Sequence, residues 1–122
     1  MATTDLLRKL AESDEIEIET RRDSKSAIHR TTIWIVPTEK GVYLRSVYVK
    51  GRWYQEALAN RNVTIRVGRR KVAARVQRVN DGSVIRAVNA GIREKYGERC
   101  PNDARSFVRL SRRHATLRLI PQ

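Results

Sequence analysis

The sequence predicts a single domain of the α+β class, mainly β: a small antiparallel barrel of about six strands with flanking helices. Its 122 residues fall within the size range of one domain and suffice to bury a hydrophobic core. Short strand-like segments follow one another through hairpin-length connections, and the crossover helices that a parallel sheet needs are missing. We therefore expect one barrel domain over residues 1–122.

The first half of the chain contains three predicted strands after a first helix. That helix can be capped by Thr3 or Thr4, and its apolar stripe is Leu6, Leu7 and Leu10. The strands alternate apolar and polar residues or are rich in β-branched residues, and they cover residues 15–20, 28–36 and 42–47. Residues 21–27 are expected to be a hairpin loop, and Pro37 is expected to end the second strand before a turn at residues 38–41.

The second half adds three strands and two helices. A short helix is predicted at residues 53–60 and a longer one at residues 83–97, where Gly97 suits a C-cap. Alternating valines, isoleucines and leucines predict strands at residues 62–67, 72–79 and 114–121. The polar stretch at residues 99–105 is expected to be a loop.

Charge is the most unusual property of the composition. The chain has a net charge of +13, but residues 1–23 hold seven acidic and four basic residues, a net of −3. Residues 24–122 hold six acidic and 22 basic residues, a net of +16. Such a field favours anionic partners such as nucleic acid or phosphorylated cofactors, and it does not choose among them.

Other compositional features narrow the class of protein. The single cysteine, Cys100, has no companions at metal-ligand spacing, and His29 and His114 lie far apart, so we expect no metal site. No apolar run reaches the roughly 20 residues of a membrane span, and the N-terminus has no apolar signal core. A cytoplasmic protein is therefore expected.

The junction between the third strand and the short helix is unusual for a turn. Within RSVYVKGRWYQEALANRNVTIRV, residues 45–67, the residues Lys50, Gly51, Arg52, Trp53 and Tyr54 combine positive charge with two aromatic rings. Turns are usually small and polar. This combination suits an anionic, flat ligand, with the positive end of the helix pointing toward the loop.

Three segments carry a resemblance to a known family. IHRTTIWIV, GVYLRS and WYQEALANRNVTIRVGRRKVAARV, in this order, resemble the split-barrel flavin and deazaflavin proteins, most of all the deazaflavin-dependent nitroreductases. The acidic DEIEI opening, the KYG helix end and the ATLRLIP ending resemble an uncharacterised bacterial domain-of-unknown-function family. The second resemblance covers nearly the whole chain.

The resemblance implies a split β-barrel that binds a flavin-type cofactor, FMN or the deazaflavin coenzyme, by its phosphate tail. It also implies a homodimer. The residues that would hold the cofactor are Arg30, Thr32, Arg45, Ser46, Lys50, Gly51, Arg52, Trp53 and Tyr54. Strand alternation puts Arg30 and Thr32 on one face and Thr31 on the other, so we expect that these three side chains cannot all point at one ligand. No catalytic residue can be assigned from the sequence.

Three classes of function remain open. The first is a cofactor-dependent oxidoreductase of unknown substrate, in which the cofactor carries the chemistry. The second is a non-catalytic small-molecule carrier on the same barrel. The third is a small nucleic-acid-binding barrel. It is less favoured because the aromatic residues of the chain are too few and too clustered for a stacking surface. Its contact surface would be the basic hairpin with Arg66, Arg69, Arg70, Lys71, Arg75 and Arg78.

Overall fold

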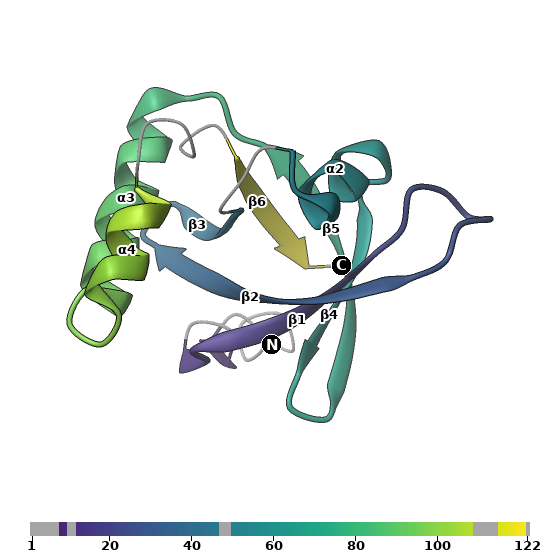
Figure 1. Ribbon diagram of the computed structural model, residues 1–122, viewed down its shortest axis with the longest axis horizontal. Coiled ribbons are helices and arrows are strands. Elements are labelled where there is room, and N and C mark those ends of the chain that lie inside the picture. Colours follow the sequence, from purple (N-terminus) through teal and green to yellow (C-terminus); the bar gives the residue numbers. More distant parts are fainter. Residues whose placement is uncertain (1–7, 10–11, 47–49, 109–114, 122) are drawn as a thin grey trace.

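Six strands form a closed antiparallel barrel in the computed structural model, which describes residues 8–9, 12–46, 50–108 and 115–121. Around the barrel the strands follow the order β1-β2-β3-β6-β5-β4 (Figure 1). The strands are β1 (Glu15–Thr20), β2 (His29–Thr38), β3 (Gly41–Arg45), β4 (Asn62–Val67), β5 (Arg70–Arg78) and β6 (Thr116–Pro121). The helices are α2 (Arg52–Ala59), α3 (Gly82–Tyr96) and α4 (Pro101–Phe107). This architecture confirms the predicted fold class.

Alternation along the strands produces two separate cores. Ile33 and Ile35 of β2 point into the barrel, whereas Trp34 and Val36 point outward, because successive side chains of a strand face opposite sides. The interior is filled by apolar residues of all six strands together with Trp53, Tyr54 and Ala57 of α2. The outer core lies between β2, β3 and the α3–α4 pair, which sits on one side of the barrel (Figure 1).

Two local predictions were wrong. β2 continues through Pro37 to Thr38, pairing with β3 after its pairing with β1 has ended at Trp34. Proline lacks a backbone N–H, and a strand that pairs with a neighbour on just one side can accommodate such a residue. The expected loop at residues 99–105 contains α4, where Pro101 occupies the first turn and Asp103 faces the positive end of the helix dipole.

The predicted first helix falls mostly outside the described residues. Leu6, Leu7 and Leu10, as well as Thr3 and Thr4, are not among them. The same holds for His114, the first residue of the last predicted strand. The other predicted strands and helices agree with the observed ones in type and order.

The last turn of α3 fastens this helix to the barrel. The Tyr96 hydroxyl lies 2.6 Å from the Asp14 carbonyl and accepts a 3.3 Å hydrogen bond from the Ile35 N–H. Lys95 Nζ donates to the carbonyls of Ser13, at 2.6 Å, and Ile35, at 2.9 Å. The Tyr96 ring also stacks on Trp34, with 3.8 Å between the ring centroids. These contacts fix how α3 lies across β2.

Lys95 gives the fold a pH dependence. Burial lowers the pKa of Lys95 from 10.5 to about 8, and it raises the pKa of Tyr96 to about 12. Between about pH 8 and 9.5 the unfolded chain therefore holds more protons at Lys95 than the folded protein does, while Tyr96 stays mostly protonated in both. Stability should rise with pH in this window, and the rise should be absent in Lys95→Met.

Urea unfolding of both proteins, at a pH just below 8 and a second near 9.5, checks this prediction. We expect the unfolding free energy of the wild type, relative to that of Lys95→Met, to be larger at the higher pH than at the lower pH. An equal difference at both pH values would contradict the assigned titration.

Candidate functional site

A cavity lies where β2 and β3 separate. β2 pairs with β3 only between Ile35 and Thr38, and its first residues, His29–Trp34, pair with β1. The cavity at this separation has a volume of about 250 Å³. It is lined by Glu15, Thr31, Thr32, Ile33, Trp34, Arg45, Ser46, Gly51, Trp53 and Phe107.

Five of the nine predicted cofactor residues line this one cavity. They are Thr32, Arg45, Ser46, Gly51 and Trp53. Thr31, the neighbour of Thr32 on β2, is in the lining as well. The reason is that the cavity sits at the edge of two separating strands, so that consecutive residues of both faces reach it. Arg30 is not in this lining.

Arg45 is the most buried charged side chain of the site. It is 2% exposed, and its guanidinium donates hydrogen bonds to four oxygens of other elements. The acceptors are Thr116 Oγ1 at 3.0 Å, the Phe107 carbonyl at 3.2 Å, the Ile85 carbonyl at 3.4 Å and Asn89 Oδ1. Arg45 thus links β3 to β6, α3 and α4, a structural role that the sequence did not indicate. Its contact with a cofactor stays a prediction.

The N-terminus of α2 forms another part of the wall. Gly51 is the N-cap residue and has no side chain to bond the first helical N–H groups, and the first turn contains no acidic residue. Such an end offers backbone donors and a positive dipole to an anion. Lys50 and Arg52, which are exposed on either side of Gly51, add charge near the cavity without lining it.

The aromatic residues of the site divide between the cavity and the barrel. Trp53 is 8% exposed and belongs to both, because it lines the cavity and packs in the barrel core. Tyr54 contacts Trp53 edge to face, at 6.1 Å between ring centroids, but it lies in the core, where burial raises its pKa. On the other wall, Trp34 stacks between Tyr96 and Phe107. Phe107 was not predicted, since it was placed beyond an expected loop.

Arg30 lies outside the cavity. Its side chain is 56% exposed, and its Nε is 3.0 Å from the Glu19 carboxylate of β1. Lys71 of β5 approaches the same carboxylate at 3.5 Å. Glu19 of β1 therefore partly neutralises basic residues of β2 and β5.

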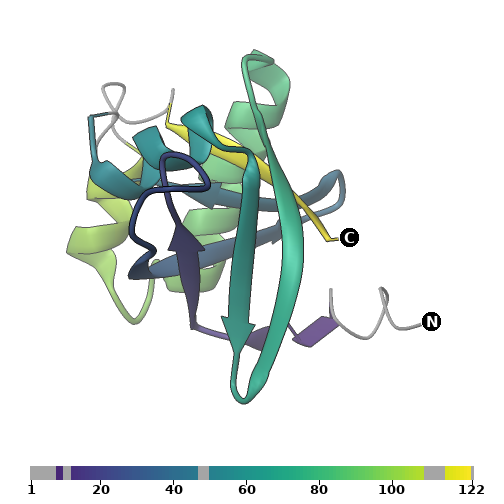
Figure 2. The same cartoon turned by 90° about the vertical axis from the view of Figure 1, so that its right-hand side faces the viewer.

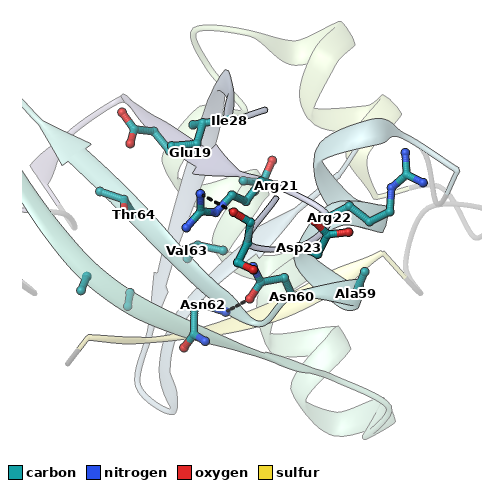
Figure 3. A pocket seen from close by; sticks show the side chains of 14 residues that line it. Glu19, Arg21, Arg22, Asp23, Ile28, Ala59, Asn60, Asn62, Val63 and Thr64 are labelled. Carbon is teal, nitrogen blue, oxygen red and sulfur yellow. Dashed lines mark hydrogen bonds between the residues drawn. The ribbon is translucent and has the colours of Figure 1, made fainter. Parts of the chain in front are cut away.

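A larger pocket lies elsewhere and contains none of the nine predicted residues. It has a volume of about 790 Å³ and is bounded by the β1–β2 loop, the end of α2 and strands β4 and β5 (Figure 3). Arg21, Arg22, Glu19 and Asp23 supply charges of both signs to its wall. Asp23 shapes the loop by accepting bonds from the Lys25 N–H at 2.9 Å and Ser26 Oγ at 3.0 Å. The sequence indicated only a loop here.

Buried polar contacts hold this loop to α2. The Glu56 carboxylate accepts a 2.9 Å hydrogen bond from Thr20 Oγ1 and lies 2.8 Å from His29 Nδ1. Thr20 and His29 face each other at the base of the β1–β2 loop. Glu56 therefore positions α2 between the two sites.

The closed barrel, with a cavity at the separation of β2 and β3, defines a split β-barrel protein. Solved structures with this fold include the heme storage protein HutZ from Vibrio cholerae, 16% identical, with a TM-score of 0.69 over 98% of this chain and 89% of that one. A putative pyridoxamine 5'-phosphate oxidase from Listeria innocua is 12% identical, with a TM-score of 0.67 over 100% and 94%. An FAD-binding protein from Mesorhizobium loti is 12% identical, with a TM-score of 0.66 over 100% and 91%.

The chain belongs to the family described as "uncharacterized protein conserved in bacteria (DUF2255)", whose model matches residues 6–119. This confirms the resemblance to an uncharacterised bacterial family. A search of curated proteins finds no match. Within the described part of the chain, no helix is long and apolar enough to cross a membrane.

Proposed function

We propose that this protein binds a flavin-type cofactor, FMN or the deazaflavin coenzyme, in the cavity between β2 and the start of α2. One observation carries the proposal: the same lining contains the buried Arg45 and the N-terminus of α2, which lacks a side-chain cap. Both features favour a phosphate. The rings of Trp34, Trp53 and Phe107 in the same lining suit a flat ring system.

The chemistry of the wall suggests how the cofactor is oriented. Glu15 is the one carboxylate in the described lining, and it comes from β1. We therefore assign the anionic part of the cofactor to Arg45, Ser46 and Gly51. Among the described residues, the lining contains no His, Cys, Met or Tyr, the side chains that ligate haem iron, so these residues favour a flavin over haem.

The size of the cavity favours a homodimer. Its 250 Å³ lie below the roughly 300–1,000 Å³ of typical ligand pockets, so one chain would enclose only part of a flavin. A second copy of the chain would complete the enclosure, with the exposed Lys50 and Arg52 near the contact.

We further propose an oxidoreductase activity with a substrate that the site does not name. A bound flavin supplies hydride-transfer chemistry. The part of this chain is to bind the phosphate with Arg45 and Ser46, to hold the ring against the tryptophans and to exclude water. If the cofactor binds but is not reduced by any nicotinamide donor or turned over, the carrier function replaces the enzymatic one.

Equilibrium dialysis against each cofactor, at low and high salt, tests the binding. We expect saturable binding that persists at high salt. Thr32→Trp, which places a large ring in the small cavity, should weaken it by about tenfold or more. Asn62→Trp is the matched control, because Asn62 is also exposed on a strand but lines the larger pocket.

Three results would count against the proposal. Absence of binding, or binding that disappears at high salt, would show that there is no specific cofactor site. Loss of binding in Asn62→Trp with normal binding in Thr32→Trp would move the ligand to the larger pocket.

A further inference from the structure

The β4–β5 hairpin forms a ribbon that extends beyond the barrel. β4 pairs with β1 only over Thr64–Arg66, and β5 pairs with β6 only from Ala74 onward. The tip, residues 67–73, therefore has ladder partners only within the hairpin itself. Both views show this two-stranded ribbon projecting from the body of the molecule (Figures 1 and 2). Gly68, at φ 59°, allows the tight turn at its end.

Positive charge is concentrated at this tip. Arg69, Arg70 and Lys71 are exposed there, and Arg66 is half-buried beside them. Lys9 borders two adjoining hollows, of about 410 and 510 Å³, together with residues of the tip, and Arg8 borders the smaller one. Glu12 is the only carboxylate among the described residues that line these hollows. The surface therefore attracts a polyanion.

The side chains around the tip discriminate between classes of polyanion. Single-stranded nucleic acid is bound by stacking on surface aromatics, and the described aromatic residues are buried or lie around the cofactor cavity and the α3–α4 core. A membrane surface is bound through exposed apolar side chains. The exposed large hydrophobic residues of the described chain, Ile28 and Ile120, belong to other segments.

A duplex fits the shape of this element. The major groove of B-form DNA is about 12 Å wide and admits a two-stranded β-ribbon. Arginines and lysines along such a ribbon meet the phosphates on both sides of the groove, which gives affinity with little dependence on sequence. We propose that the β4–β5 ribbon binds duplex DNA through phosphate contacts of Arg66, Arg69 and Arg70. This binding is independent of the cofactor proposal.

Fluorescence anisotropy with a labelled mixed-sequence duplex of about 20 base pairs, between about 50 and 200 mM salt, tests the inference. The wild type should bind the duplex, and the logarithm of its binding constant should fall linearly with the logarithm of the salt concentration. The double variant Arg69→Glu with Arg70→Glu should weaken binding by about 100-fold at low salt. It should also reduce the slope of this logarithmic salt dependence by about two, one for each lost phosphate contact.

The matched control is Arg86→Glu with Arg93→Glu, which makes the same change in net charge at exposed positions on α3. We expect this control to bind almost as the wild type does, and thermal melting shows whether each variant is folded. Absence of duplex binding by the wild type would overturn the inference. So would equal losses in both variants, since net charge alone would then explain binding. Tighter binding to the corresponding single strand, or to phosphatidylserine vesicles, would also overturn it.

Discussion

Replacing Arg45 by alanine should lower the free energy of unfolding by about 3 kcal/mol or more. Arg45 is 2% exposed, and its guanidinium donates to Asn89, Thr116 and two backbone carbonyls. Alanine would remove these donors from buried acceptors and leave a cavity where β3 meets α3 and α4. An effect of this size is a large fraction of the stability of a typical domain, about 5–15 kcal/mol.

Urea denaturation measures this effect, with Arg93→Ala as the control for loss of an arginine at an exposed site of α3. The control should change stability by less than about 0.5 kcal/mol. Arg45→Lys should recover only part of the loss, because an ammonium cannot reproduce the fork of the guanidinium. If Arg45→Ala unfolds at the same urea concentration as the control, the buried hydrogen-bond network does not stabilise the fold.

Substituting Gly91 by alanine should also destabilise the protein, although alanine is the better helix former. A Cβ at Gly91 would lie 2.7 Å from Val36 Cγ1 and 3.4 Å from the Pro37 carbonyl. Val36 is 1% exposed and cannot give way, so α3 would have to move off β2. Overpacking of about 1–3 kcal/mol outweighs a helix-propensity gain of about 1 kcal/mol.

A double-mutant cycle with Val36→Ala separates this clash from other effects. Val36→Ala alone should cost about 2 kcal/mol because it opens a cavity. In the double variant the new methyl group occupies that space. Its loss of stability should therefore be smaller than the sum of the two single losses by about 1 kcal/mol or more. Strict additivity would mean that Val36 is not the residue that requires glycine at position 91.

Local sequence signals predicted most of the elements because those signals act within a few residues. The β-branched run of residues 28–36 and the alternation of residues 15–20 and 62–67 predicted strands in the right places. α4 was missed because Pro101 and Asp103, which favour a helix start, stand in a short polar stretch that also suits a loop. A proline such as Pro37 ends a strand where the strand must donate backbone N–H groups to neighbours on both of its edges. The sequence does not show which edges of the strand are paired.

The structure places two residues of the strand-to-helix junction in the cavity, whereas the positions of other predicted residues depend on contacts between distant elements. Gly51 and Trp53 line the cavity because their positions follow from the start of α2. Arg30 is engaged by Glu19, a contact fixed by the pairing of β1 with β2. The larger pocket depends on how the β1–β2 loop lies against α2, for which the sequence carries no local signal.

By itself, the sequence determined the order and type of the strands, the preference for a closed antiparallel barrel and the strong basic charge of the body. Periodicity and turn chemistry suffice for these properties because they are local or additive along the chain. Only the tertiary structure decided that β2 and β3 separate, that Thr31 and Thr32 both reach the resulting cavity and that Arg45 is buried beneath α3 and α4. Register and helix docking set these features, and they arise from contacts between residues far apart in the sequence.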